Sequence, residues 1–180
     1  MAFLDKIIGA ATPPESDEHR LRVRAETRVE TVPGDWLSLI LDHHDAIEQA
    51  FEAVRIADDA HTRRAAQRRL AVLLTGHSIA EEAVLYPEMA DSGHKSHAGV
   101  AYEEQSMAKV QLALLDKIEP MSQDYLDKLE HLRGAVTHHM FQEESNWFLD
   151  LKAQVPAERQ ALLAARYREE VERYIGSEHV

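Results

Sequence analysis

The chain has 180 residues, a formal net charge of −12 and no cysteine, and 44% of its residues are hydrophobic. The lack of cysteine excludes a disulfide framework, a thiolate zinc site and a cysteine nucleophile. The acidic balance argues against a nucleic-acid partner, because phosphate binding needs clustered lysine and arginine. No apolar run approaches the roughly 20 residues that span a bilayer, and Asp5 interrupts the short apolar start, which makes a poor signal peptide. We expect a cytoplasmic protein that does not insert into membranes.

Residues 1–34 are predicted to form an N-terminal arm. Thr12-Pro13-Pro14 would interrupt a helix, and the highly charged residues 15–30 are predicted to be a surface helix or a partly ordered arm. One helical face within residues 3–8 carries the apolar residues Phe3, Leu4, Ile7 and Ile8. We expect that face to dock on the rest of the protein, the alternative being contact with a membrane or a partner.

Four long helices and one shorter helix are predicted after the arm. Asp35 follows a proline and a glycine and is a natural N-cap for the first of them. Glycine and proline fall between the helical segments, and no run has the period-two alternation of a strand. The predicted helices cover about residues 35–57, 62–88, 96–119, 122–151 and 157–175.

The predicted fold is therefore all-α. Four helices of this length with short connections favour an up-down-up-down four-helix bundle over residues 35–152. Residues 153–180 form an additional C-terminal helix and tail.

Three His-x-x-x-Glu pairs are the strongest candidates for chemistry, since this spacing places both side chains on one face of a helix. The pairs are His44/Glu48, His77/Glu81 and His139/Glu143. All except Glu48, which we expect on a solvated flank, continue the apolar stripes of their helices and should face the bundle interior. Burying an unpaired charge destabilises a fold by roughly several kcal/mol. A single metal ion could bind all these groups together.

The candidate residues should also meet at one level of the bundle. At a rise of 1.5 Å per residue, antiparallel neighbours bring them into one layer near one end. Residues 77–86 align without a gap with residues 139–148 at an offset of 62, and the same offset carries His44 to within one residue of Gln105. Each hairpin would thus supply one group from its first helix and a His-x-x-x-Glu pair from its second. Such an arrangement builds a two-ion site with carboxylate bridges.

This pattern resembles the hemerythrin-like family of HHE cation-binding domains over about residues 35–152. The residues that carry the resemblance are Asp42-His43-His44, Ile47, His77, Glu81-Glu82, Leu85-Tyr86-Pro87, His138-His139, Glu143-Glu144 and Phe148. The resemblance implies a bundle that holds two non-haem iron ions, joined by an oxo or hydroxo bridge. One iron would keep an open position for a small ligand such as dioxygen or peroxide. The implied ligands are His44, His77, Glu81, His139 and Glu143.

The third helix departs from the family pattern. Where such domains usually have a histidine, this chain has Gln105, whose neutral amide is a poor iron ligand. Tyr102 lies three residues earlier on the same face. We predict that the Tyr102 phenolate replaces the missing histidine, with Gln105 or no residue as the alternatives. A phenolate favours oxidised iron, which shifts the expected chemistry from reversible oxygen carriage toward peroxide or redox reactions. Tyr86, near the predicted end of the second helix, is expected in the core.

The predicted function is to bind or react with dioxygen or peroxide, or to handle iron or redox stress. Imidazole and carboxylate ligands favour iron over zinc. Two alternatives stay open: a module that senses oxygen, iron or redox state without turnover, and a degenerate bundle that serves as a scaffold. The sequence leaves open whether the protein is an enzyme, and whether it has a protein partner or forms homo-oligomers.

Overall fold

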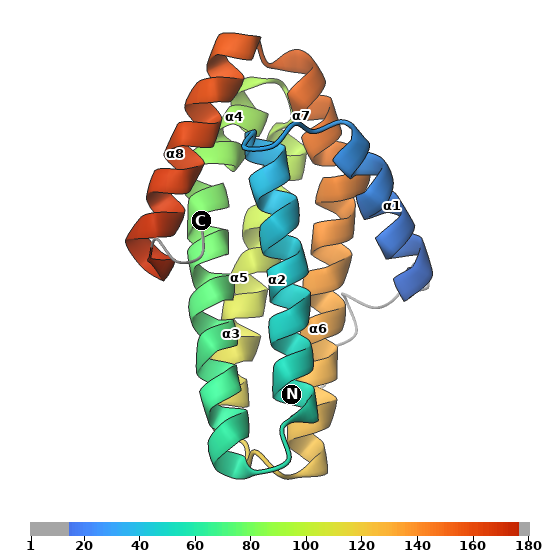
Figure 1. Cartoon of the computed structure of the whole chain (residues 1–180), viewed down its shortest axis with the longest axis vertical. Coiled ribbons are helices and arrows are strands. Elements are labelled where there is room, and N and C mark those ends of the chain that lie inside the picture. Colours follow the sequence, from blue (N-terminus) through green and yellow to red (C-terminus); the bar gives the residue numbers. More distant parts are fainter. Residues whose placement is uncertain (1–14, 177–180) are drawn as a thin grey trace.

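A computed structural model describes residues 15–176, and this part of the chain is helical throughout its regular structure (Figure 1). Four long helices lie side by side with alternating direction. They are α2 (Trp36–Ile56), α3 (Ala60–Ala80), α5 (Lys95–Leu115) and α6 (Gln123–Gln142). The predicted all-α, up-down-up-down four-helix bundle is therefore confirmed. The predicted apolar face at residues 3–8 lies outside the described residues.

Side-chain caps explain where three of the long helices begin. Asp35 Oδ1 accepts a hydrogen bond from the Ser38 amide at 2.6 Å, which confirms the predicted cap of α2. Asp59 and Ser122 cap α3 and α6 in the same way. Each cap satisfies one of the amide groups that a helix leaves without a partner in its first turn.

Helices α3 and α6 each continue through a π-helical turn into a short helix. The turn η1 (Glu81–Leu85) leads into α4 (Tyr86–Asp91), and η2 (Glu143–Trp147) leads into α7 (Phe148–Gln154). At each turn the amide five residues on donates to the carbonyl of the leading glutamate, which is the bonding pattern of a π turn. Both turns therefore begin at a candidate ligand. The sequence predicted uninterrupted helices here, and it missed the turns.

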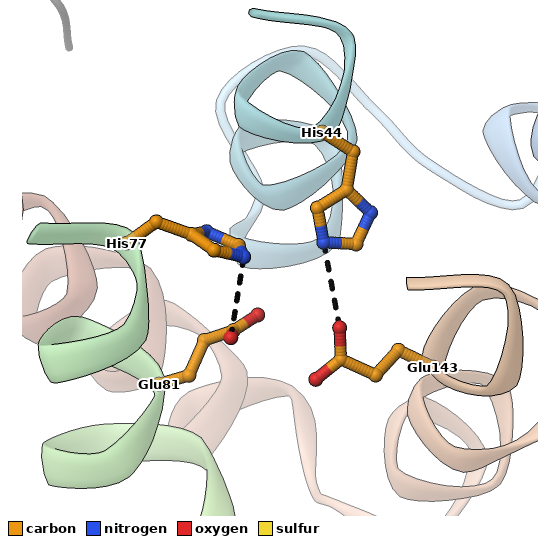
Figure 2. A group of neighbouring side chains, drawn as sticks. All are labelled: His44, His77, Glu81 and Glu143. Atoms are coloured by element: carbon orange, nitrogen blue, oxygen red, sulfur yellow. Dashed lines mark ion pairs between the residues drawn. The ribbon is translucent and has the colours of Figure 1, made fainter. Parts of the chain in front are cut away.

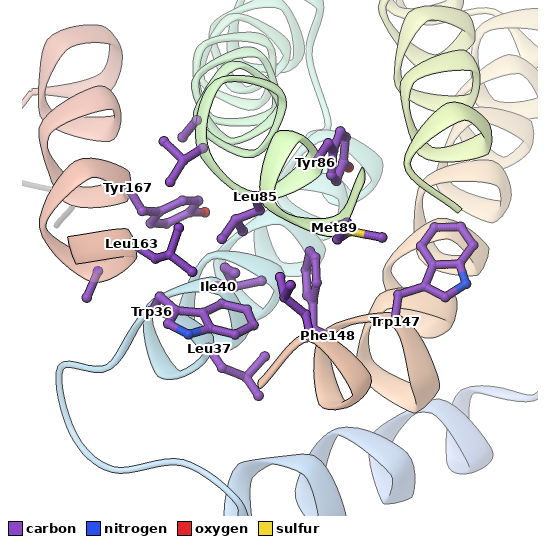
Figure 3. Close-up of a cluster of buried hydrophobic side chains, with 14 of the residues drawn as sticks. Trp36, Leu37, Ile40, Leu85, Tyr86, Met89, Trp147, Phe148, Leu163 and Tyr167 are labelled. Carbon is purple, nitrogen blue, oxygen red and sulfur yellow. The ribbon is translucent and has the colours of Figure 1, made fainter. Parts of the chain in front are cut away.

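Two hydrophobic clusters fill the bundle. The first, which we call the Trp36 cluster, lies at the end covered by α4 and α7 (Figure 3). Its largest fully buried side chains are Trp36, Tyr86, Phe148 and Tyr167. The second, which we call the Phe51 cluster, fills the opposite end between the long helices. Its largest fully buried side chains are Tyr125, Phe51, Ile47 and Leu70. Burial of this apolar surface is the main force that holds the four helices together.

Two further helices flank the bundle, α1 (Asp17–Val29) on one side and α8 (Ala157–Ile175) on the other (Figure 1). Helix α8 packs across α3 and α2, whereas α1 lies against η2, α2 and α6. Their buried residues differ in kind: those of α8 are Leu163, Ala164, Tyr167 and Val171, and those of α1 are Arg20, Arg24 and Thr27. Among the described residues, no helix is both long and apolar enough to cross a bilayer.

Gly76 allows α8 to approach α3 closely. A β-carbon at this position would lie 2.9 Å from Ile175 Cδ1 and nearer still to its Cγ1. We expect Gly76→Ala to lower the free energy of unfolding by about 1–3 kcal/mol in urea denaturation, because the end of α8 must shift. Gly134→Ala in α6 is the matched control, since its β-carbon would meet no atom within 4 Å. The control should gain about 0.5–1 kcal/mol from helix propensity, and equal losses in both variants would contradict the close packing.

Candidate metal centre

Two histidines and two glutamates meet in the bundle interior (Figure 2). His44 comes from α2, His77 from α3, and Glu81 and Glu143 are the first residues of the two π turns. One ligand atom from each lies within 4.8 Å of those from the other three. No member of this group, which we call the ligand cluster, exposes more than 2% of its surface. The structure thus brings together four of the six residues predicted from the sequence.

In the ligand cluster, the nitrogen and oxygen atoms that point inward lack hydrogen bonds to other described residues. Within the described part of the chain, His44 Nε2, His77 Nε2, Glu81 Oε1 and Glu143 Oε2 are buried and have no hydrogen-bond partner. The nearest approaches, drawn in Figure 2, are 3.3 Å from His77 Nε2 to Glu81 Oε2 and 3.4 Å from His44 Nε2 to Glu143 Oε2. Each unpartnered buried group costs about 1–3 kcal/mol, and native proteins rarely leave several together. Imidazole and carboxylate groups are donors that transition metals bind well, so these residues fit a metal ion.

The outer ring nitrogens of the two histidines are held by other side chains. His44 Nδ1 lies 2.7 Å from Glu144 Oε1, in η2. His77 Nδ1 lies 3.0 Å from the hydroxyl of Tyr167, which α8 carries into the bundle. Such contacts are typical of metal-binding histidines, because they fix the ring and direct the other nitrogen to the ion.

His139 lies beside the ligand cluster. Its Nδ1 is 2.8 Å from Glu104 Oε2 of α5, so its outer nitrogen is also held. Its Nε2 lies 3.2 Å from Glu143 Oε1 and 3.1 Å from the hydroxyl of Tyr86. The ring is therefore directed at the second oxygen of a carboxylate that also belongs to the ligand cluster.

The Tyr86 hydroxyl occupies the space bounded by these groups. It lies 2.9 Å from Glu143 Oε1, 3.2 Å from Glu81 Oε2 and 3.1 Å from His139 Nε2. It also accepts a hydrogen bond from Gln105 Nε2 at 2.6 Å. One phenol oxygen thus lies within hydrogen-bond distance of both glutamates and of His139.

Sequence reasoning placed Tyr86 only in the core. In an α-helix, a residue five positions after Glu81 lies about 140° around the axis, away from the glutamate. The π turn bonds residue i to i+5 and brings Tyr86 back toward Glu81. The one available signal was the internal repeat, which aligns Tyr86 with Phe148. Phe148 has no hydroxyl and meets Trp36 edge to face, with ring centroids 5.6 Å apart.

The structure does not bring Tyr102 into the ligand cluster. Its hydroxyl donates to the carbonyl of Glu82 at 2.6 Å, and 38% of the residue is exposed. Gln105 does lie in the layer, where its Nε2 also donates to Glu81 Oε2 at 2.6 Å. The third long helix thus supplies an amide donor and the carboxylate of Glu104 behind His139.

Burial and nearby charge separate the two carboxylates of the ligand cluster. Burial raises the pKa of Glu81 well above its usual value, and the charge of Glu143 raises it further. Burial acts in the same direction on Glu143, but His139 and His44 outweigh it and hold the pKa of Glu143 below its usual value. In the absence of an ion, Glu81 is therefore the first of the two to take up a proton as the pH falls.

The pKa values of the two histidines of the ligand cluster are also shifted in opposite directions. Burial lowers the pKa of His77 well below its usual value, and the charge of His44 lowers it further. Burial also opposes the charged form of His44, yet the neighbouring carboxylates of Glu143 and Glu144 raise the pKa of His44 to about 9. His77 is thus neutral and ready to bind an ion, whereas His44 must lose a proton first. Cation binding here releases protons.

Known proteins resemble this chain in sequence and in fold. The family model described as Hemerythrin HHE cation binding domain matches residues 37–150. The crystal structure of a hemerythrin HHE cation binding domain-containing protein from Mycobacterium kansasii has a TM-score of 0.70 and 20% sequence identity, over 79% of this chain and 88% of that chain. A DNA nickase from Nostoc sp. is 23% identical over 168 residues. That match covers 93% of this chain but 44% of the nickase, so the chain spans less than half of that protein.

The family match spans both hairpins that supply the ligand cluster. It begins within α2, ends within α7, and includes both π turns. The resemblance inferred from the histidine and glutamate motifs is confirmed. The chain belongs to the hemerythrin family of HHE cation-binding domains.

Proposed function

We propose that this protein binds non-haem iron at the ligand cluster and reacts there with dioxygen or peroxide. The observation that carries the proposal is the set of four buried ligand atoms that face one another without hydrogen-bond partners among the described residues. Nitrogen and carboxylate ligands without thiolate suit iron. Bound iron supplies the one-electron and oxygen chemistry that side chains lack.

His44, His77, Glu81 and Glu143 would hold the first ion. A second ion would use His139 together with Glu81 Oε2 and Glu143 Oε1, the two oxygens that now lie near the Tyr86 hydroxyl. Tyr86 would have to release both carboxylates for that ion to bind. The two-iron form is thus the more demanding part of the proposal, and Tyr86 is the residue that controls it.

The chain's own residues supply a dry site with a few fixed hydrogen-bond donors. The ligand cluster lies between the Trp36 and Phe51 clusters, which exclude water from it. Gln105 Nε2 and the Tyr86 hydroxyl are the donors that face the layer. Burial raises the pKa of Tyr86 well above its usual value, and the charge of Glu143 adds to this, so the phenol keeps its proton. Both groups are placed to donate hydrogen bonds to a small oxygen ligand.

DNA nicking is the named activity of one relative, and we do not extend it to this chain. The chain spans 44% of that relative. Its net charge of −12 also opposes binding to the phosphate backbone, which requires clustered positive charge.

The proposal is tested by loading the protein with Fe²⁺ without oxygen and then measuring iron per chain, the ultraviolet–visible spectrum and peroxide consumption. We expect at least one iron per chain and consumption of many equivalents of peroxide per iron. Iron binding without turnover would instead favour a sensing module. Failure to bind iron would overturn the proposal and favour a scaffold.

A further inference from the structure

Arg24 of the flanking helix α1 binds three carboxylates at once. Its Nε donates to Glu144 Oε1 at 2.7 Å, its Nη1 to Asp45 Oδ1 at 2.8 Å, and its Nη2 to Glu48 Oε1 at 2.9 Å. Arg24 is 4% exposed, so this long charged side chain is directed inward. The planar fork of arginine directs separate N–H groups at the three acceptors, whereas lysine is a compact point charge without this fixed geometry.

Glu144 links this arginine to the ligand cluster. It is fully buried, and its Oε1 accepts both from Arg24 and from His44 Nδ1, each at 2.7 Å. Thr27, one turn after Arg24, donates from its hydroxyl to the backbone carbonyl of Glu144 at 2.8 Å. Helix α1 therefore holds both the side chain and the backbone of the residue behind His44.

Helix α1 docks on the bundle through these polar contacts. Of its three large apolar residues, Leu21 and Val29 are 57% and 80% exposed and Val23 is half-buried, whereas its buried residues are arginines and a threonine. The helix also lies outside the residues that match the family model. An element beyond the shared domain thus reaches, through one carboxylate, to a candidate metal ligand.

We infer that Arg24 is a positioning residue of the metal centre: it holds Glu144 in place, so that Glu144 fixes the His44 ring with Nε2 directed at the cation. Helix α1 then contributes to cation affinity without touching the ion. The part of this inference that concerns the ion rests on the proposed function. Loss of an outer hydrogen-bond partner of a metal ligand typically lowers metal affinity about 10- to 100-fold.

The test compares Arg24→Ala with Arg28→Ala in the full chain. Arg28 lies on the same helix and also binds two carboxylates, Asp42 at 2.7 Å and Asp45 at 2.8 Å, but among the described residues it forms no hydrogen bond or ion pair with Glu144. Co²⁺ affinity is measured by competition with a chelator, and circular dichroism checks the fold. Arg24→Ala should bind Co²⁺ about 10- to 100-fold more weakly than wild type, and Arg28→Ala should bind it as wild type does. Arg24→Lys, which keeps the charge, should fold and recover only part of the affinity.

A measurement on the metal-free protein separates this inference from the proposed function. The proton on His44 Nδ1, hydrogen-bonded to Glu144, should give a downfield NMR signal in the wild type. We expect this signal to be unchanged in Arg28→Ala and shifted or broadened in Arg24→Ala. If the two variants match in both affinity and NMR signal, the inference is overturned. If the wild type binds no cation but only Arg24→Ala alters the signal, Arg24 does position His44 and the proposed function is the part that fails.

Discussion

His77→Ala is expected to lower cation affinity by more than about 100-fold. This loss is larger than the loss typical when a side chain that only hydrogen-bonds to a metal ligand is removed. His77 is the candidate ligand that α3 supplies, and its Nε2 is buried without a hydrogen-bond partner in the described residues. Its neutral ring needs no proton removed before binding, since burial lowers the pKa of His77. The alanine variant keeps three candidate ligands for the ion and leaves an empty space where the His77 ring was. Isothermal calorimetry with Co²⁺ measures the affinity directly.

Thermal unfolding provides a second measurement of the same change. A cation present at 100 times its dissociation constant stabilises the wild-type fold by about 2.7 kcal/mol, and His77→Ala should lose that gain. His61→Ala is the matched control, because His61 lies on the same helix and is exposed. The ligand assignment would be contradicted if the cation stabilised His77→Ala as much as it stabilises His61→Ala.

Tyr86→Phe is expected to lower the free energy of unfolding of the metal-free protein by about 1–3 kcal/mol, because it leaves buried polar groups without a partner. The groups that lose the hydroxyl are Glu143, Glu81, His139 and Gln105. The phenyl ring keeps its place in the Trp36 cluster, so the loss is confined to hydrogen bonds. Urea denaturation of the metal-free protein measures it.

The same variant should keep the first ion and favour a second. Tyr86→Phe leaves His44 and His77 intact, and it removes the hydroxyl that lies near Glu81 and Glu143. We therefore expect at least as many ions per chain as in wild type when both are titrated with Co²⁺. Fewer ions per chain would show that the Tyr86 oxygen itself binds the metal.

Tyr102→Phe is the control for both measurements. The rings of Tyr102 and Tyr86 lie 5.1 Å apart, but the Tyr102 hydroxyl bonds to the backbone and is partly exposed. Its loss should change stability by no more than about 0.5 kcal/mol, with metal content unchanged. Loss of metal from Tyr102→Phe would instead support the Tyr102 phenolate as the ligand from the third helix.

Periodicity and capping predicted the helices, and periodicity with the helix rise predicted that the residues of the ligand cluster would meet. The apolar stripe of each helix placed His44, His77, Glu81 and Glu143 inside, and the helix rise placed them at one level. Asp35 marked the start of α2, where the structure shows its cap. These features follow from regular α-helix geometry, so the sequence carries them locally.

The other parts of the site depend on features that a strict helical period does not contain. The π turn at Glu81 brings Tyr86 to the site, against its α-helical phase. Tyr102 and Gln105 lie three residues apart, about 60° around a helix, which suffices to place one inside and the other at the surface.

Contacts between distant segments were also beyond sequence reasoning. Arg24 and Glu144 are 120 residues apart, and His77 and Tyr167 are 90 residues apart. Both contacts exist because α1 and α8 dock on the bundle, which is a result of tertiary packing. No local pattern in either helix identifies its partner.

Crystallography of the iron-loaded protein, with anomalous diffraction at the iron edge, tests the metal centre most directly. We predict the strongest anomalous peak among His44 Nε2, His77 Nε2, Glu81 and Glu143, with both imidazole rings directed at it. A peak elsewhere in the molecule, or no peak in this layer at full iron loading, would contradict the assignment of the site.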